Sequence, residues 1–322
     1  MTCFKLASLV VLATIAAAPV MAAPFPDKPV TIVVPFPPGG ASDSTARFIA
    51  PKMQEALGQP VVIENRPGAN GSTGGGLVKQ AKADGYTLLV GSIGVFAINP
   101  ALFPNLPYNP AKDFDLLTVA VRTPNVLVAN PSFPANNVAE LIEYLKKNPN
   151  TVTFASSGNG SSDHLTAALF WQKTGTTGIH VPYKGGGPAI TDLIGGHADV
   201  SFQNLGAVAS QIKAGKLKIL AVTAAERNPL FPDVPTAKQA GVDGLEVYSW
   251  QAAAAPKGLP SEVQAQLSKA LGAALGDPAT KARFNELGFD VVANSPEEFA
   301  KFQAAEEARW RTVVTQGKIV TQ

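Results

Sequence analysis

The chain has 322 residues, of which 46% are hydrophobic and 16% charged, with a formal net charge of +2 at pH 7 and a single cysteine. A nearly neutral balance without a block of Lys and Arg argues against nucleic-acid binding, and one cysteine excludes an internal disulfide and any cysteine-based zinc or iron–sulfur site. The apolar content is too high for a disordered chain, and at roughly 150 residues per domain the length predicts two domains.

The first 22 residues have the pattern of a secretory signal peptide. Lys5 precedes an apolar run over residues 6–20, and small residues follow up to Ala22. The run is shorter than the ~20 residues that span a bilayer, and an uncleaved membrane anchor is the alternative. Cys3 lies before the run, whereas a bacterial lipoprotein has its cysteine at the cleavage point. We expect export to the periplasm with cleavage near Ala22.

From residue 30 onward, strand and helix patterns alternate. Apolar runs predict strands at 30–34, 61–64 and 86–90, and helical spacing of apolar residues predicts helices at 43–57 and 74–82. Gly58 is suited to end the first helix, and Pro51 is expected to kink or split it. The repeated strand–helix–strand order predicts a parallel sheet.

Residues 99–123 are rich in Pro and Asn and predict a crossing to a second alternating block. Its strands are expected at 126–129, 152–155, 179–182, 199–202 and 218–222, and its helices at 138–147, 164–173, 188–194 and 207–214. The apolar run 247–255 is expected to return to the first block, where helices follow at 261–275, 280–287 and 296–314. We therefore predict an α/β protein with domain 1 at 23–122 plus 247–322, domain 2 at 123–246, two crossing strands and a ligand cleft between the domains.

Three loops between a strand and a helix are rich in glycine and are candidates for holding an anion. They cover residues 35–43, 156–163 and 184–188. Glycine lets a backbone turn sharply next to a ligand, and the free N–H groups of a first helical turn favour negative charge. Each loop alone is equally compatible with an ordinary turn, but two such loops in matching places of two blocks could grip a ligand from both sides.

Motifs from one family run through nearly the whole mature chain. They are residues 35–40 (Pro-Phe-Pro-Pro-Gly-Gly) with Asp43, 64–69 (Glu-Asn-Arg-Pro-Gly-Ala), 84–88 (Asp-Gly-Tyr-Thr-Leu), 106–110 (Leu-Pro-Tyr-Asn-Pro), 157–161 (Ser-Gly-Asn-Gly-Ser) with His164, 180–185 (His-Val-Pro-Tyr-Lys-Gly) and 233–236 (Asp-Val-Pro-Thr). In this order they resemble the solute receptors of the tripartite tricarboxylate transporter family, the Bug or TctC receptors. The chain departs from the family pattern near the hinge, at Ala252, where glycine is more frequent, and at Leu259, where threonine is common.

The resemblance implies a type II periplasmic-binding-protein fold that closes on a small carboxylate and delivers it to membrane permease subunits. The ligands of such receptors are di- and tricarboxylates, acidic amino acids or aromatic acids, bound through backbone N–H groups, hydroxyls and ordered waters. Carried over, the ligand-binding residues are Phe36, Gly40, Ala41, Ser42, Asp43, Ser157, Gly160, Ser161 and Ser162. Further candidates at the strand ends of domain 2 are Lys184, Gly185 and Asn204.

His164 and Trp250 have two possible roles each, and Glu306 has one. His164 opens a helix beside the second loop and either contacts ligand or makes a structural hydrogen bond. Trp250, in the return crossing, either lines the cleft or packs the hinge. Glu306 lies on an apolar face of the last helix, which predicts a half-buried carboxylate that accepts a hydrogen bond and takes no part in catalysis.

No motif indicates a metal, a cofactor or catalysis. His164, His180 and His197 lack the close helical spacing of a zinc protease. The Ser-x-x-Lys, Ser-Asp-His and Lys-Thr-Gly sequences occur in the wrong order for a penicillin-recognising enzyme. We expect a monomeric receptor without cofactor or metal, and not an enzyme. The alternatives are a sensor that presents its ligand to a signalling partner and, more remotely, a serine hydrolase.

Overall fold

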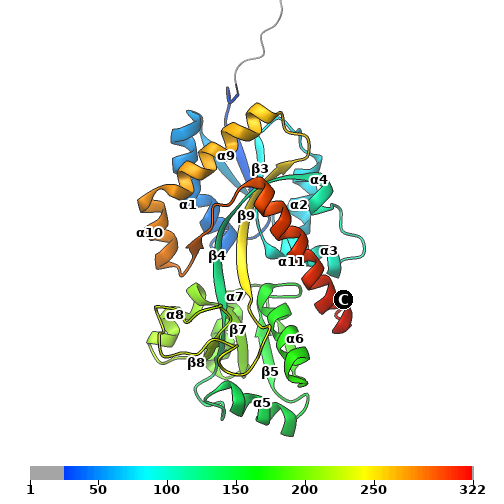
Figure 1. The fold of residues 1–322 in the computed structure, drawn as a ribbon, viewed down its shortest axis with the longest axis vertical. Helices are drawn as coiled ribbons and strands as arrows, with labels where there is room; N and C mark the ends of the chain where they lie inside the picture. The colour runs from blue at the N-terminus through cyan, green and yellow to red at the C-terminus, as the bar shows by residue number, and fades with distance from the viewer. Residues whose placement is uncertain (1–24, 321–322) are drawn as a thin grey trace, which may run out of the picture.

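The computed structural model describes residues 25–320, which form two lobes joined by two long strands (Figure 1). The predicted signal peptide, residues 1–22, lies outside the described residues. A ten-stranded sheet runs through both lobes in the order β2-β1-β3-β9-β4-β7-β5-β6, with β10 and β8 also paired to β4. We name the lobes upper and lower as they stand in Figure 1. Within residues 25–320, no helix has the length and apolarity needed to cross a membrane.

The upper lobe begins with three parallel strands, β1 (Val30–Val34), β2 (Val61–Asn65) and β3 (Thr87–Ser92), connected by α1 (Ala41–Leu57) and α2 (Ser72–Gln80). β1 is buried because it lies between its two neighbours and helices cover both faces of the sheet. Later in the chain, α9 (Ser261–Gly276) and α10 (Pro278–Glu286) pack beside α1 (Figure 1). These elements confirm the predicted order, with small shifts at their ends.

Pro51 lies inside α1, and the helix is not split there. The neighbouring apolar residues Ile49 and Met53 are both fully buried. Their packing outweighs the roughly 3 kcal/mol by which an interior proline disfavours a helix. Gly58 ends α1 in the left-handed conformation, with φ 67°, as predicted.

Two antiparallel strands, β4 (Phe114–Ala129) and β9 (Tyr248–Pro256), connect the lobes. β9 confirms the predicted return crossing. β4 pairs with β9 as far as Pro124 and with β7 and β8 from Asn125 onward. The strand predicted at 126–129 is therefore much longer than expected. Nearly all of β4 is buried, so it has no alternation of apolar and polar residues that would mark a strand.

The stretch before β4 contains elements that the sequence did not predict. They are a π-helical turn (Gly94–Ile98), α3 (Asn99–Leu102) and α4 (Pro110–Asp113). A two-residue strand, β10 (Asp290–Val291), also pairs with β4. All of these are short, and short elements carry little periodicity.

The lower lobe follows the predicted alternation. Its strands are β5 (Thr153–Ser156), β6 (Ile179–Pro182), β7 (Val200–Asn204) and β8 (Lys218–Val222). Its helices are α5 (Val138–Lys147), α6 (Ser162–Thr174), α7 (Gly186–Gly195) and α8 (Leu205–Lys213). β5 is parallel to both β6 and β7, so the carboxyl ends of β5 and β6 lie at the same edge of the sheet.

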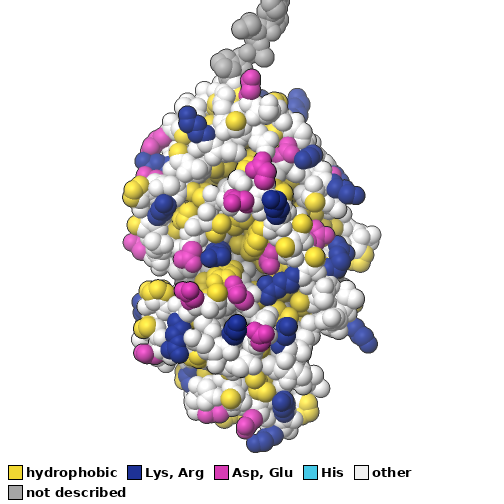
Figure 2. All heavy atoms as spheres, viewed as in Figure 1, with side chains coloured by type: hydrophobic (Ala, Val, Ile, Leu, Met, Phe, Trp, Pro, Cys, Tyr) yellow, Lys and Arg dark blue, Asp and Glu magenta, His cyan; other side chains and the backbone are white. Residues whose placement is uncertain are grey.

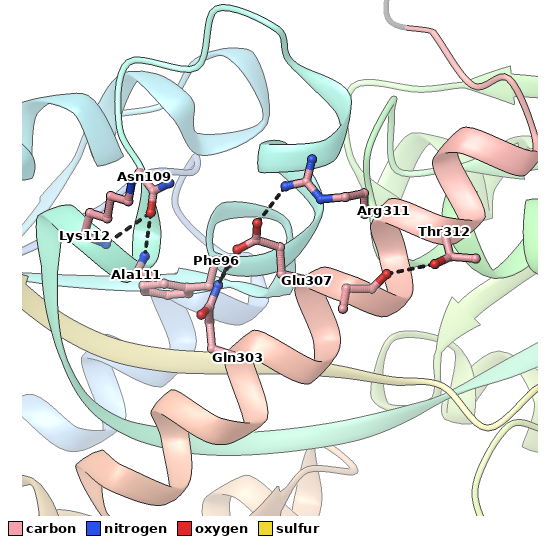
Figure 3. A network of polar contacts seen from close by, with 9 residues as sticks. Phe96, Asn109, Ala111, Lys112, Gln303, Glu307, Arg311 and Thr312 are labelled. Carbon is pink, nitrogen blue, oxygen red and sulfur yellow. Dashed lines mark hydrogen bonds and ion pairs between the residues drawn. The ribbon is translucent and has the colours of Figure 1, made fainter.

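The last helix, α11 (Pro296–Gln316), contacts both lobes. In the upper lobe, the Gln303 side chain donates to the carbonyl of Phe96 at 2.8 Å and to Glu307 at 3.0 Å (Figure 3). Farther along, Gln172 of α6 donates to the carbonyl of Val313 at 2.8 Å. Figure 1 shows the helix running from the crossing strands down to the level of α6. It therefore bridges the two lobes beside the hinge.

Candidate functional site

Three loops lead from the carboxyl end of a parallel strand into a helix, as predicted. The first loop (35–43) joins β1 to α1, the second loop (156–163) joins β5 to α6, and the third loop (184–188) joins β6 to α7. Gly39, Gly160 and Gly185 have φ values of +87°, +79° and +111°, which only glycine adopts readily. Because first-turn N–H groups have no partner within their helix, each loop presents donors that favour an anion.

Asp43 fixes the shape of the first loop. Its Oδ2 atom accepts from the N–H of Gly39 at 2.9 Å and from Arg47 Nε at 2.8 Å. Its Oδ1 atom accepts from Asn65 at 3.0 Å. Burial opposes ionisation of Asp43, but these donors outweigh it and lower the pKa of the carboxyl below its usual value. Asp43 is thus a buried, fully partnered carboxylate behind the loop.

The rest of the first loop is divided between buried and open positions. Ser42 is buried, and its hydroxyl donates to Gln251 of β9 at 2.5 Å. Phe36 is half-buried with its ring against Gly71, where an added Cβ would lie 3.1 Å from the ring. Gly40 is exposed and Ala41 half-exposed. The open part of this loop is therefore the backbone at the start of α1.

Asp163 fixes the second loop in the same manner as Asp43 fixes the first. Its Oδ2 atom accepts from the N–H and the hydroxyl of Ser157 at 2.6 and 2.7 Å, and from Gln203 at 3.4 Å. Ser161 caps α6 by accepting from the N–H of His164, and its hydroxyl donates to the carbonyl of Gly158 at 2.6 Å. Complete burial raises the pKa of Asp163, although hydrogen bonds from Ser161 and Ser157 act in the opposite direction.

A pair of stacked histidines supports the second loop. The rings of His164 and His180 are 3.7 Å apart and nearly parallel. His164 Nδ1 accepts from the N–H of Gly160 at 3.2 Å, and His180 Nε2 lies 2.6 Å from the Ser156 hydroxyl. Burial lowers the pKa of His164 to about 3, with repulsion from His180 adding to it, and burial lowers the pKa of His180 to about 4. Both rings are therefore neutral at pH 7, and His164 has a structural hydrogen bond.

Hydrogen bonds link the helix start that follows each of these two loops to a crossing strand. Asn204 donates to Asn125 of β4 at 2.6 Å and to the Ser162 hydroxyl at 3.4 Å. Ser162 is thus linked to β4, as Ser42 is linked to β9 through Gln251.

The third loop lies against the second. The N–H of Gly185 donates to the carbonyl of Ser157 at 3.1 Å, and an added Cβ at Gly186 would lie 3.3 Å from the Ser157 hydroxyl. Lys184 is exposed beside this contact. The structure therefore brings Lys184 and Gly185 to the edge of the second loop.

Two asparagines that the sequence analysis did not single out connect the lobes at this place. Asn70, between β2 and α2, donates to the carbonyl of Gly160 at 2.9 Å and to Asn99 at 2.9 Å. Phe36 of the first loop packs against Gly71, the residue after Asn70, so the turn at residues 69–71 contacts both the first and the second loop. The Asn-Gly sequence at 70–71 is a turn signal, but its partner is 90 residues away.

Trp250 packs the hinge. It is fully buried, and its indole N–H donates to Glu306 at 3.2 Å, while that of Trp310 donates to the same oxygen at 3.1 Å. Gln251, the next residue of β9, points to Ser42, and adjacent strand residues face opposite sides of a sheet. Trp250 therefore lines a cavity of about 440 Å³ beside α11, on the side away from Ser42. Glu306 is half-buried and accepts hydrogen bonds, as predicted.

Acidic and basic side chains are interspersed across the middle of the molecule, with hydrophobic ones between them (Figure 2). Within residues 25–320, no group of three His, Cys, Asp or Glu side chains is arranged to hold a metal ion. Ser156 and His180 are close enough for a nucleophile–base pair, but Ser156 is only 1% exposed. The hydroxyl therefore cannot reach a substrate, which speaks against a serine hydrolase.

Solved structures that resemble this chain include a periplasmic transporter and a periplasmic binding protein. Rpa4515 of R. palustris, solved with adipate, is 37% identical and covers 92% of this chain and 99% of its own, with a TM-score of 0.85. MatC of Rhodopseudomonas palustris, solved with bound malate, is 35% identical over 90% of this chain and 100% of its own, with a TM-score of 0.83. The periplasmic binding protein BugD is 36% identical and covers 92% of this chain and 100% of its own, also with a TM-score of 0.83.

The family model described as the tripartite tricarboxylate transporter family receptor matches residues 45–319. This range begins within α1 and takes in the rest of both lobes, the crossing strands and all of α11. Together with the two-lobed architecture, it confirms the expected periplasmic-binding-protein fold and the expectation of a receptor without enzymatic activity. The chain belongs to the tripartite tricarboxylate transporter receptors, a family of periplasmic solute-binding proteins.

Proposed function

We propose that this protein binds a small dicarboxylate between its lobes and delivers it to the membrane permease subunits of a tripartite tricarboxylate transporter. The observation that carries the proposal is the matched pair of helix starts, each led by a glycine-rich loop and fixed by a buried aspartate, Asp43 in the upper lobe and Asp163 in the lower. Two relatives of similar length were solved with adipate and with malate, which are both dicarboxylates.

In this proposal the carboxylate groups meet backbone donors. Gly40 and Ala41 supply N–H groups from the upper lobe. In the lower lobe, Gly160 and Ser161 directly precede the N–H groups of the first turn of α6. Phe36 forms an apolar wall. Such donors bind anions without a cationic clamp, which agrees with the low content of charged residues. Most of the remaining proposed residues contribute through backbone groups or by shaping the loops, because their side chains have partners within the protein: Ser42, Asp43, Ser157, Ser162, His164 and Asn204. Gly185 contributes through its backbone, which holds the third loop against the second.

Binding is proposed to close the lobes by rotation about β4 and β9. We place the domain boundaries at residues 123 and 246, near the point where β4 exchanges β9 for β7 and β8 as its neighbours. Lys184 stands at the rim of the second loop, where its charge would attract an anion into the open cleft. The mature receptor would begin near residue 23, after removal of the signal peptide in the periplasm.

A thermal-shift screen of small acids on the mature protein tests this function. Ligand at 100 times its dissociation constant adds about 2.7 kcal/mol of stability, and the melting temperature should rise by several degrees with adipate or malate. The diamide of adipic acid should give no shift, because it carries no negative charge. Absence of a shift with any mono-, di-, tri- or aromatic carboxylate would contradict the proposal.

Gly160→Pro is the matching loss-of-binding variant. Proline fixes φ near −65°, whereas Gly160 has φ +79° and its N–H donates to His164. The variant should fold, as judged by circular dichroism, and should show no shift with adipate or malate. Retained affinity would place the second loop outside the site.

A further inference from the structure

Asn70 has a backbone conformation that is unfavourable for a residue with a side chain. It lies in a short turn (Ala69–Gly71) with φ 50° and ψ 40°, in the left-handed region. Asparagine tolerates this region better than most residues, but such a conformation persists only where its surroundings hold it. The hydrogen bonds of Asn70 to its neighbours stabilise this conformation.

Asn99 holds Asn70 through two reciprocal hydrogen bonds. Asn70 Nδ2 donates to Asn99 Oδ1 at 2.9 Å, and Asn99 Nδ2 donates to the backbone carbonyl of Asn70 at 2.9 Å. Asn99 is itself fully buried and also donates to the hydroxyls of Ser72 and Tyr108, at 3.2 and 3.4 Å. The Asn70 side chain is therefore aimed by a buried polar network of the upper lobe.

The second proton of the Asn70 amide points to the lower lobe. Asn70 Nδ2 donates to the carbonyl of Gly160 at 2.9 Å, while the N–H of Gly160 donates to His164. Both backbone polar groups of Gly160 therefore have partners. An added Cβ at Gly160 would lie 2.8 Å from Asn70 Nδ2 and 3.2 Å from Leu102, so the two lobes touch here without space for a side chain.

We propose that Asn70 is a positioning residue of the ligand site, and this inference rests on the proposed function. The Asn70–Gly160 hydrogen bond orients the second loop, so that the N–H groups at the start of α6 face a carboxylate held by the first loop. It joins an upper-lobe side chain to a lower-lobe carbonyl. It is present whenever the lobes are closed, whether or not ligand is bound, and it breaks when they part. Loss of this hydrogen bond should therefore speed the release of ligand more than it changes the entry of ligand.

Asn70→Asp tests this role with a side chain of the same shape. The substitution replaces the donor with a carboxylate oxygen that faces the carbonyl of Gly160. Asn150→Asp is the matched control, because Asn150 is an exposed residue with φ 56° and undergoes the same change of charge in the same backbone conformation. Asn70→Gly is a second variant, which removes the side chain and keeps the left-handed backbone without strain.

Stopped-flow binding of adipate and of malate gives the first readout. Loss of one hydrogen bond, with a repelling oxygen in its place, should raise the dissociation rate constant about tenfold in Asn70→Asp and several-fold in Asn70→Gly. The association rate constant should change by less than about threefold, because the bond forms after encounter. A rate of dissociation equal to that of Asn150→Asp in both Asn70 variants overturns the proposal.

Hydrogen exchange of the ligand-free proteins gives the second readout and does not depend on the ligand. Amides of residues 158–165 should exchange at least about fivefold faster in Asn70→Asp than in Asn150→Asp, while β1 and β3 exchange equally in both. Unchanged exchange in 158–165 overturns the proposal even if both acids bind. Failure of the unaltered protein to bind any acid contradicts the proposed function, and the exchange comparison still tests the bond between the lobes.

Discussion

The first and second loops have the same plan and different electrostatics. Each leads from a buried strand into a helix, and each has an aspartate that accepts the N–H of an earlier loop residue, Asp43 from Gly39 and Asp163 from Ser157. Arg47 accompanies Asp43 at 2.8 Å, whereas Asp163 has only neutral donors around it. The pKa of Asp43 is accordingly lowered and that of Asp163 raised.

This difference indicates how each lobe holds its helix start. The upper lobe uses the ion pair between Asp43 and Arg47, and the lower lobe uses the buried Asp163 carboxyl in a loop that is supported by two neutral histidines. The second loop is also the one whose central glycine touches the other lobe. We therefore expect the second loop to be the more sensitive of the two to pH and to substitution.

The largest expected effect is acid destabilisation through the second loop. His164 and His180 have pKa values of about 3 and 4 in the folded protein against 6.5 for an unperturbed histidine. The unfolded chain therefore binds protons that the folded protein does not, and stability present above pH 6.5 is lost as the pH falls towards 4. Urea unfolding at pH 7 and 5 should differ by up to about 4 kcal/mol, since one pKa unit corresponds to about 1.4 kcal/mol per group.

His164→Asn together with His180→Gln should flatten this dependence between pH 7 and 5, whatever the stability of the variant at pH 7. His197→Gln, a change at the remaining histidine, should leave the slope as it is. An equally steep loss of stability in the double variant would assign the acid sensitivity to groups outside the second loop.

The next largest effect concerns the glycines of the two loops. Gly160→Ala should destabilise the protein by about 3 kcal/mol and abolish binding of adipate and malate, because Gly160 has φ +79° and an added Cβ would lie 2.8 Å from Asn70. Gly40→Ala should change stability by less than about 0.5 kcal/mol, because Gly40 has φ −81° and the nearest atom to an added Cβ is 3.9 Å away. Thermal unfolding and calorimetric titration of the two variants measure the contrast. A similar loss of stability in both variants would contradict the view that the second loop is the more sensitive of the two to substitution.

The two aspartates should respond differently to the same change. Asp43→Asn breaks a buried, charge-assisted pair and should cost about 2 kcal/mol at pH 7. Asp163→Asn keeps an acceptor for Ser157 and removes a charge that burial penalises, so it should cost less than about 1 kcal/mol. Urea unfolding at pH 7 is the measurement. A larger loss for Asp163→Asn would mean that this carboxylate is stabilised by its donors to a degree that the raised pKa does not reflect.

The last prediction concerns Glu306, which lies outside both loops and serves as their reference for binding. Glu306→Ala leaves the indole N–H groups of Trp250 and Trp310 without their shared acceptor and should lower stability by about 1–2 kcal/mol, since the adjoining cavity admits water. Affinity for adipate and malate should not change. A loss of binding at an unchanged melting temperature would place Glu306 in the functional site.

Much of the fold was predictable where apolar runs are short and bounded by turn residues. The strands at 30–34, 179–182 and 218–222 and the helix at 138–147 have the predicted bounds. β4 was found only at its end, because burial on both faces removes alternation. Pro124 within β4 also interrupts a strand pattern, and here it lies where the strand passes from one lobe to the other.

For the candidate site, the loops themselves could be predicted and the contacts between them could not. Glycine-rich stretches before Ser42 and Ser161 indicate where a helix starts. The glycines and the helix start are close together in the sequence, so this signal can be seen without the structure. The partners of these loops are Gln251, Asn204 and Asn70, which lie 209, 42 and 90 residues along the chain from Ser42, Ser162 and Gly160. Polar residues without periodicity give no sign of such pairings. The family resemblance supplied the loops as ligand-binding segments but did not indicate Asn70 or Asn99.

The central claim is that the starts of α1 and α6 bind one carboxylate ligand between the lobes. Amide chemical shifts of the ¹⁵N-labelled mature protein, followed during titration with malate and with adipate, test it most directly. We expect the largest shifts at residues 40–43 and 160–163, in both lobes at the same ligand concentration, with Asn150 unaffected. Shifts confined to one lobe, or centred on the cavity beside Trp250, would contradict it.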